Sequence, residues 1–520
     1  EYQNMFNLPF FLGLFPLVVL VVLIINVKMP VYKAVLVTLA LVLGITYFGF
    51  DTPAPVLANA VAYGLLKGLW PIVIIIFAAV FAYNLMLKTG AMNVIRDQLS
   101  RVTDDRRLLL LLITWGFGAF LEAAAGFSTA VAIPLGILMA LGFHPIRAAI
   151  AALVADTTAT VFGAVGIPLT VMGDMLHIPV VGLTGLSAYT VFQLAILNVL
   201  IPFFLVVIME GSVKALKGIF FVTLMAGVMT LIPEVIIAIF VGPELTAFGG
   251  SMVSMAAMFF LFRARKGKTP AEYRVATENG GKEATGGEVV RAVSIYALMF
   301  IFILACSPLF PGVGKVLNTV SSSLSFDVGV KTLKATFNWI TTPGMLIIFA
   351  TLIGGVLFQG AKPGVIIKTA LQTANQMKTS AVAISVIVAM ATIMDITGLI
   401  AVVAQPLFDA TGKYYPFFAP FIGAVGTFVT GSVTNANVLF GNLQTIAANH
   451  LNLDPTWLVA ANAAGASATK MLAPQSITIA VSSAGLTNAD SQLMKGTAPW
   501  ALIYCVVLVL VIGLSSMFFF

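Results

Sequence analysis

The sequence predicts an all-α polytopic membrane protein with about 12 transmembrane helices and two re-entrant hairpins. Of its 520 residues, 60% are hydrophobic and 9% are charged, and the mean hydropathy is +1.05, which excludes a water-soluble globular domain. Its apolar runs have the length of a bilayer-spanning helix and lack the short alternating pattern of membrane-barrel strands. The third observation is an internal repeat.

Two related halves are indicated by segments that recur at a nearly fixed offset. Two pairs of segments are 308 residues apart: KTGAM (88–92) with ITGLI (396–400), and GAFLEAAAGF (118–127) with GTFVTGSVTN (426–435). A third segment, ADTTATVFGAVGIP at 155–168, recurs as GASATKMLAPQS at 465–476, with an offset between 306 and 310. Duplicated halves with polar, helix-breaking segments at membrane depth are typical of secondary transporters.

Hydropathy predicts twelve crossings and two interrupted stretches. The crossings are expected at 8–26, 34–50, 71–88, 146–172, 187–210, 218–242, 244–262, 290–308, 341–360, 380–398, 456–482 and 497–518. The first lacks a basic leader and a cleavage site, so it is interpreted as a span. The apolar stretches 107–143 and 416–449 are broken by EAAAGFST (122–129) and TGSVTNAN (430–437). Because only backbone shielded by protein or facing water can break a helix at this depth, both are predicted to be re-entrant hairpins.

Basic residues predict the orientation, because cytoplasmic loops hold most Lys and Arg. With both termini outside the cytoplasm, 21 of the 27 basic residues lie inside and one, Lys470, lies within a span. The five left outside are Lys67, Lys315, Lys331, Lys334 and Lys413. In this topology 71–88 and 380–398 run in opposite directions. The repeats are therefore predicted to be inverted, with the first hairpin opening to the cytoplasm and the second to the exterior.

The chain is predicted to consist of two halves and a polar connector. The N-terminal half, 1–262, includes the first repeat core at 71–172, and the C-terminal half, 290–520, includes the second at 380–482. The segment 263–289 is rich in Gly, Lys and Glu and is predicted to be a cytoplasmic linker.

The sequence also argues against several chemistries. The only cysteines, Cys306 and Cys505, lie in apolar segments, so no disulfide framework, metal site or cofactor is expected. The three histidines lie near predicted span ends and no HExxH is present, so the protein is not expected to be an enzyme. The basic excess is explained by membrane orientation, and no nucleic-acid partner is expected. Oligomerisation is left open.

Ionisable residues inside spans are candidates for coupling, because each costs about 2.5–3.5 kcal/mol on insertion scales. Glu122 at the first hairpin break and Asp156 near mid-membrane are the leading candidates for proton coupling. Glu122 could alternatively tie down the hairpin tip by hydrogen bonds. Asp395 is a third candidate, but a scaffold role is equally open because the matching residue of the first half is Leu87. Glu234, outside both repeat cores, is expected to be structural.

Lys470 is the one basic residue within a predicted span, in a small-residue segment that ends at Pro474 and unwinds easily. It is predicted either to pair with a carboxylate or to bind an anionic substrate, and both hold if substrate displaces the internal partner. Phe127, Met471 and Leu472 would suit a short alkyl tail, although ordinary packing is the alternative. Neutral groups for a small hydroxy acid complete the predicted site: Thr430, Ser432, Thr434, Asn435, Asn437, Asn442, Asn462, Ser467, Thr469 and Gln475.

The motifs GAFLEAAAGF, ADTTATVFGAVGIP, VTGSVTNANVLFG and KMLAPQSITIA resemble those of the bacterial L-lactate permease family, and the resemblance covers nearly the whole chain. It implies a multi-pass cytoplasmic-membrane symporter that takes up L-lactate, and often glycolate, with protons. It also implies a transport domain that slides past a scaffold like an elevator. The chain departs from the family pattern at Ala123, where Gly is expected, and at Val433, where an acidic residue is expected.

The missing carboxylate at Val433 shifts the expected proton role to Glu122 and Asp156. Two other functions remain open: a sodium-coupled carrier of another small carboxylate, and an anion channel. A channel would need a continuous pore and ohmic conductance.

Overall fold

The fold is described from a computed structural model that covers residues 8–126, 129–275, 284–329 and 331–518. In these ranges eleven helices are long and apolar enough to cross a membrane: Leu8–Ile25, Val31–Gly49, Ala54–Lys88, Arg106–Ala125, Pro145–Met175, Gly182–Glu210, Phe220–Phe240, Pro243–Arg263, Gly286–Ala305, Pro363–Ile396 and Asp490–Phe518. Ten coincide with predicted crossings, and Arg106–Ala125 is the first arm of the stretch 107–143. The predicted crossings 341–360 and 456–482 are a shorter helix and an interrupted one. The prediction of a polytopic helical membrane protein is confirmed.

The N-terminal half is helical throughout its described part. Its helices are α1 (Leu8–Ile25), α2 (Val31–Gly49), α3 (Ala54–Lys67), α4 (Ile74–Lys88), α5 (Ala91–Leu99), α6 (Arg106–Leu110), α7 (Ala119–Ala125), α8 (Thr129–Ala140), α9 (Pro145–Ala159), α10 (Gly163–Met175), α11 (Val180–Glu210), α12 (Phe220–Phe240) and α13 (Pro243–Arg263). π-Helical segments at Gly68–Val73 and Leu111–Gly118 join α3 to α4 and α6 to α7.

The C-terminal half adds a β-hairpin to its helices. Its elements are α14 (Gly286–Ala305), α15 (Pro311–Leu317), β1 (Ser321–Asp327), β2 (Thr332–Asn338), α16 (Pro343–Ile353), α17 (Pro363–Ile396), α18 (Leu399–Thr411), α19 (Tyr415–Thr430), α20 (Val433–Leu451), α21 (Pro455–Ala468), α22 (Pro474–Ser483) and α23 (Asp490–Phe518). β1 and β2 pair antiparallel, so the all-α prediction is wrong here. Leu333, Ala335 and Phe337 are buried at every second position, the pattern of a half-buried strand.

Two of the predicted crossings begin too late. The helical run α3–α4 begins at Ala54 and not at 71, and α17 begins at Pro363 and not at 380. Both missed beginnings carry polar side chains, including Lys67 and Lys368, which lower the hydropathy of any window that contains them. The prediction that Lys67 lies in an exterior loop is therefore wrong. It is buried within a spanning run, so Lys470 is not alone as a basic residue in a span.

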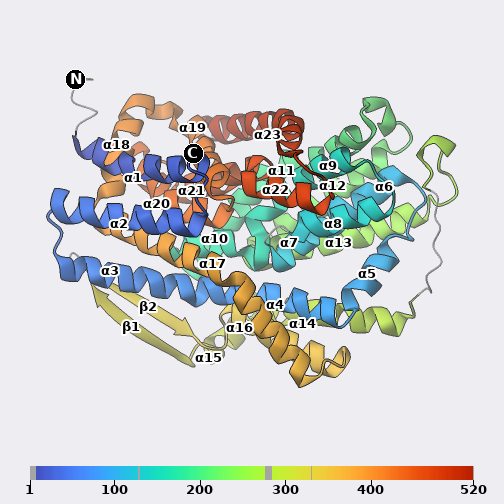
Figure 1. Ribbon diagram of the computed structural model, residues 1–520, viewed down its shortest axis with the longest axis horizontal. Coiled ribbons are helices and arrows are strands. Elements are labelled where there is room, and N and C mark those ends of the chain that lie inside the picture. Colours follow the sequence, from blue (N-terminus) through green and yellow to red (C-terminus); the bar gives the residue numbers. More distant parts are fainter. Residues whose placement is uncertain (1–7, 127–128, 276–283, 330, 519–520) are drawn as a thin grey trace.

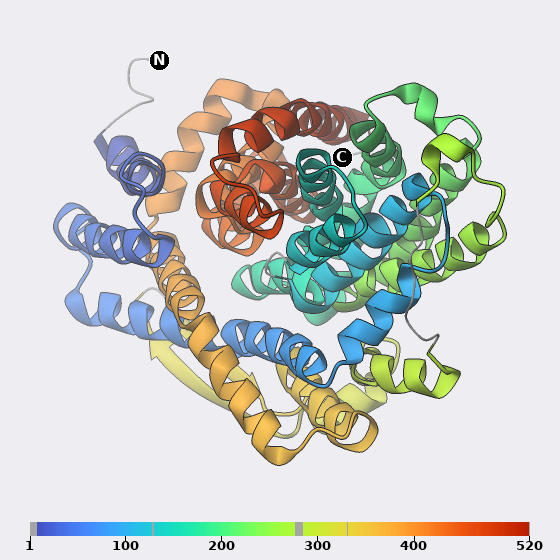
Figure 2. The same ribbon diagram turned by 45° about the vertical axis from the view of Figure 1, so that its right-hand side comes forward.

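Helices α2, α3, α4, α14, α16 and α17 form what we call the crossing layer (Figures 1 and 2). α17 packs along α2, α3 and α4, and its backbone comes very close to Gly64 of α3 and to Gly68, the first residue of the π-helical segment after α3. A Cβ atom at either glycine would overlap α17 at Ala389 or Ser385, so small residues let the two backbones touch. Figure 2 shows this layer on one side of a second body, the hairpin bundle, made of α6–α13 and α19–α23.

Candidate substrate-binding site

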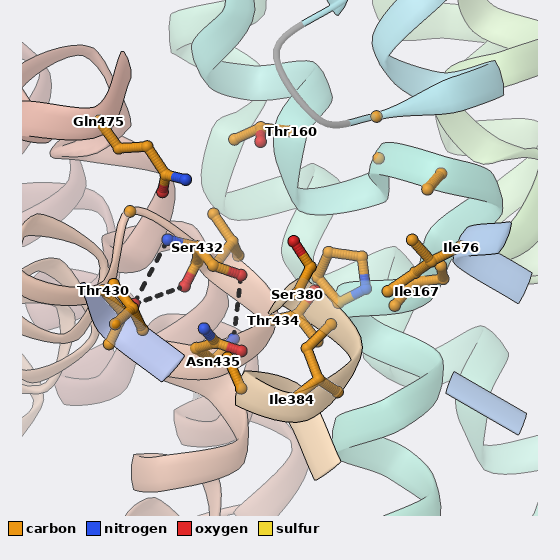
Figure 3. Close-up of a pocket in the computed structure, with 18 of the residues that line it drawn as sticks. Ile76, Thr160, Ile167, Ser380, Ile384, Thr430, Ser432, Thr434, Asn435 and Gln475 are labelled. Carbon is orange, nitrogen blue, oxygen red and sulfur yellow. Dashed lines mark hydrogen bonds between the residues drawn. The ribbon is translucent and has the colours of Figure 1, made fainter. Parts of the chain in front are cut away.

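The second half breaks its helical path between α19 and α20. Gly431 adopts the left-handed conformation with φ 70°, which favours glycine. Thr430 Oγ1 donates to the Gly426 carbonyl at 2.8 Å and accepts from the Ser432 amide at 3.3 Å. Ser432 Oγ accepts from the Asn435 amide at 3.3 Å and thereby caps α20 (Figure 3). Side chains thus satisfy backbone groups that the break sets free, and the hydroxyls stay at the tip.

Lys470 reaches this break from the neighbouring interrupted helix. A three-residue 3-10 turn, Lys470–Leu472, separates α21 from α22, and Pro474 begins α22. Lys470 is 8% exposed, and its Nζ donates to the Gly431 carbonyl at 2.9 Å. Gln475, in the first turn of α22, covers Gly431 so closely that a Cβ there would overlap its Oε1. The buried ammonium is therefore held by a neutral carbonyl, with capacity left for an anion.

Glu122 lies at the hairpin break of the first half, at the repeat position of Thr430. It lies in the last turn of α7, four residues before Gly126, which has φ 63°. Its Oε1 accepts a hydrogen bond from Thr160 Oγ1 at 3.1 Å. Thr160 begins the 3-10 turn that separates α9 from α10. Gly163 makes room for the carboxylate, because a Cβ there would lie 2.7 Å from Oε1.

The start of α10 is strained. Ala164, Val165 and Gly166 have φ of 45°, 61° and 75°, three successive left-handed residues. For a β-branched residue such as Val165 this is a genuine outlier, and strain of this kind costs about 1–3 kcal/mol per residue. Gly166 is also pressed against the first turn of α13, where a Cβ would lie 2.5 Å from the Pro243 carbonyl. Packing against α13 stabilises this strained conformation, and strained backbone of this kind is common at functional sites.

Asp156 lies one helical turn before Thr160, behind Glu122. The two residues are 2% and 3% exposed. Within the part of the chain that the structure describes, which leaves out 127 and 128, both oxygens of Asp156 and Oε2 of Glu122 are buried without a hydrogen bond of ordinary geometry. Each carboxyl group interacts electrostatically with the other and with Lys470. Helix α7 and the two interrupted helices thus bring two acids and one base together.

A cavity of about 490 Å³ lies where the hairpin bundle meets the crossing layer. Its polar wall comes from the bundle and consists of Glu122, Thr160, Thr430, Ser432, Thr434, Asn435, Lys470 and Gln475. Ile76, Ile167 and Ile384 line the opposite, apolar part (Figure 3). Thr379 and Ser380 of α17 add hydroxyls from the crossing layer. A concave site with one cation, several neutral donors and an apolar wall suits a small amphipathic anion.

Several predicted site residues do not reach this cavity. Asn437 donates to the Pro168 carbonyl at 2.9 Å, and Asn462 donates to Asn437 Oδ1 at 3.1 Å. Ser467 shares a 2.7 Å hydrogen bond with Tyr504. These three tie buried helices together. Phe127 lies outside the residues that the structure describes.

Asp395 lies apart from Glu122 and Asp156. It is at the exposed end of α17, where Oδ1 accepts from Asn442 at 2.5 Å and Oδ2 lies 3.4 Å from Lys331 Nζ. Conversely, the sequence interpretation missed Thr160, Thr379 and Ser380. Thr160 matches Lys470 as the first residue of a 3-10 turn, so the repeat could have identified it.

Comparison with known proteins decides the family. A family model described as L-lactate permease matches residues 9–519. The chain belongs to the L-lactate permease family. Its resemblance to that family, read from the motifs, is confirmed. As a member with eleven candidate spans in its described part, it is a multi-pass membrane protein.

Relatives in this L-lactate permease family are similar over most of their length. The L-lactate permease of Streptococcus iniae is 42% identical over 76% of this chain and 82% of that protein. The L-lactate permease of Bacillus subtilis is 33% identical over 90% of this chain and 89% of that protein. The glycolate permease GlcA of Escherichia coli K12 is 31% identical over 98% and 95%. These proteins are named permeases, and none of the names indicates an enzyme. Among solved structures, the YdaH transporter of Alcanivorax borkumensis has a TM-score of 0.47 and 12% identity, covering 90% of this chain and 88% of that one.

Proposed function

We propose that the protein takes up L-lactate and glycolate across the cytoplasmic membrane by proton symport. One observation carries the proposal: Lys470, a buried ammonium whose hydrogen bond within the described residues goes to a neutral carbonyl, lines a small cavity together with Glu122. Relatives named for L-lactate and for glycolate indicate the substrate class.

The cavity offers a partner for each part of a 2-hydroxy acid. Lys470 binds the carboxylate, since a charge-assisted hydrogen bond is stronger than the neutral one to Gly431. The 2-hydroxyl group finds donors and acceptors at Ser432 and Asn435. The methyl group of lactate faces the apolar wall at Ile76 and Ile167. Glycolate lacks this methyl group and occupies the same polar contacts.

Charge balance provides the reason for proton coupling. The site holds two buried carboxyl groups, Glu122 and Asp156, beside one ammonium, Lys470. A substrate carboxylate adds a third negative charge in a setting where like charges strongly disfavour one another. Protonation of Glu122 at the cavity wall relieves this repulsion. Substrate and proton therefore bind together.

We also propose that the halves are inverted repeats and that the hairpin bundle moves past the crossing layer. The left-handed glycines recur in order, with φ 78° at Gly90 and 74° at Gly398, then 63° at Gly126 and 70° at Gly431. Each half then has a three-residue 3-10 turn between two helices. The cavity lies at the boundary of the two bodies, which is where alternating access requires it.

Counterflow tests the function. Purified protein in liposomes loaded with unlabelled L-lactate is expected to take up labelled L-lactate and glycolate. Imposing a pH gradient alone is expected to drive net accumulation, and a sodium gradient alone is not. Accumulation with sodium only would replace the proton by sodium, and ohmic current in a planar bilayer would indicate a channel.

A cross-link tests the movement. Ser380 on α17 and Ser432 at the hairpin tip line the cavity from the two bodies. In protein whose Cys306 and Cys505 are replaced by Ala, Ser380→Cys with Ser432→Cys joined by a bismaleimide is expected to lose transport. Each single cysteine variant, treated in the same way, is the control. Full transport by the cross-linked protein would instead support local gating.

A further inference from the structure

A second cavity, of about 170 Å³, lies beyond the first along the same helices. It is lined by residues of the crossing layer, the hairpin bundle and the β-hairpin, with polar groups from Lys67, His177, Lys331, Asp395, Asn437 and Asn442. Asp395 is already bound by Lys331 and Asn442. Lys67 is the buried cation of this cavity.

Helices α10, α17 and α20 line both cavities, α20 with Thr434 at the first and Val438 at the second. On α17, Ile384 faces the first cavity and Val388 the second; on α10, Pro168 faces the first and Met172 the second. In each pair the residues are one helical turn apart. Asn437, which lines the second cavity, donates to the carbonyl of Pro168, which lines the first. The two cavities are therefore neighbours along these helices.

Lys67 holds an internal carboxylate across the boundary of the two bodies. Its Nζ lies 2.6 Å from Asp174 Oδ2, with the Lys67 side chain 10% exposed and the Asp174 side chain 40% exposed. Lys67 belongs to α3 of the crossing layer and Asp174 to α10 of the bundle. If the bundle slides, the pair must separate, and a buried ammonium without a counter-charge is costly.

We propose that Lys67 is a second binding residue for the substrate carboxylate and that Asp174 occupies its place in the conformation seen here. This inference rests on the proposed function. When the bundle moves, Asp174 leaves and the carboxylate of lactate or glycolate supplies the missing charge. Asn437 and Asn442 provide neutral groups for the substrate beside it. In the predicted topology this site faces the exterior, so it receives substrate on entry.

Competition for Lys67 and a purely structural ion pair predict different changes in the half-saturating lactate concentration of the two variants. If Asp174 competes with the substrate for Lys67, Asp174→Asn lowers the half-saturating lactate concentration for uptake and Lys67→Met raises it. If the ion pair only locks the two bodies together, both variants break the same lock and shift the value in the same direction.

The experiment measures initial uptake of labelled L-lactate by cells that express each variant, over a range of external concentrations at fixed pH. We expect an increase of about tenfold for Lys67→Met and a decrease of about threefold for Asp174→Asn. Lys67→Arg keeps the charge and is expected to stay within about twofold of wild type. Shifts of equal sign, or none, overturn the inference.

Three further outcomes are covered by the same experiment. If Lys67→Met does not fold, Lys67→Gln takes its place, because the direction of the Lys67 shift relative to that of Asp174→Asn separates competition from a structural ion pair. Wild-type protein that transports neither lactate nor glycolate overturns the proposed function and this inference with it. Transport by wild type with equal-sign shifts overturns only the inference.

Discussion

The two interrupted helices have the same geometry and opposite chemistry. In the first half Thr160 begins a three-residue turn and donates to Glu122 of its own hairpin. In the second half Lys470 begins a three-residue turn and donates to Gly431 of its own hairpin. The first turn presents a hydroxyl bound to an acid, and the second presents a base. Equivalent backbone breaks can thus support unlike roles when two matched positions differ: Thr160 against Lys470, and Glu122 against Thr430.

Replacing Lys470 is expected to have the largest effect of the predicted changes, and the affected quantity is the affinity for L-lactate. Lys470→Met should weaken L-lactate binding about 10- to 100-fold, because a hydrogen bond to a charged group contributes about 1.5–3 kcal/mol. Calorimetric titration of the protein in detergent measures it. Lys368→Met, which removes an exposed cation of α17, is the matched control and should bind normally. Unchanged affinity in the first variant would make Lys470 a structural residue.

Neutralising the acid is expected to separate two activities. Glu122→Gln resembles the protonated side chain, so lactate-for-lactate exchange should persist while accumulation driven by a pH gradient disappears. Both assays are run on one liposome preparation. Glu234→Gln is the control, since Glu234 is equally buried but bonds to Asn198 at 2.6 Å and does not line the cavity. If Glu122→Gln still concentrates lactate, the proton travels by another group, with Asp156 next.

A substitution next to Glu122 tests whether proton-driven uptake depends on the position of its carboxylate. In Gly163→Ala the added methyl group would lie 2.7 Å from Glu122 Oε1, so the carboxylate must shift. Proton-driven uptake should fall about five- to thirtyfold, which corresponds to about 1–2 kcal/mol, the lower part of the range for overpacking penalties. Gly136→Ala, on α8 with open space around it, is the control. Equal uptake by both variants would show that the site tolerates a displaced Glu122.

The smallest effect is expected from the hydroxyl that mirrors Lys470. Thr160→Val removes one hydrogen bond to Glu122, and a loss of about 1 kcal/mol corresponds to about fivefold slower proton-driven uptake. Thr160→Ser retains the donor and should restore the rate. If the Thr160→Val and Thr160→Ser variants have the same uptake rate, the hydroxyl does not position Glu122. The two turns would then share only their backbone geometry.

The sequence located both breaks because polar residues in apolar runs are conspicuous and the repeat offset pairs them. Glu122, Lys470 and the tip residues from Thr430 to Asn435 line the cavity that the motifs suggested. The far wall could not be predicted. Thr379 and Ser380 reach the cavity only because α17 packs across the bundle, and no local pattern encodes such a crossing.

Two other misses have a local cause. Lys67 lowers the hydropathy around it, so its stretch resembles a loop until the ion pair with Asp174 is seen. The β-hairpin did carry a signal, the alternation of Leu333, Ala335 and Phe337, but it is too short to stand out in a chain dominated by long apolar helices.

The way in which α17 lines both cavities has a consequence for the surrounding lipid. Its contributions, Thr379–Ile384 and Val388–Asp395, have centres about ten residues and therefore about 15 Å apart. A bundle that carries substrate between them travels about half the thickness of the hydrocarbon core, which is about 30 Å. The apolar outer surface of the bundle would then lie among the lipid headgroups unless the bilayer deforms. Turnover should therefore depend on the acyl-chain length of the host membrane, while equilibrium binding of the substrate should not.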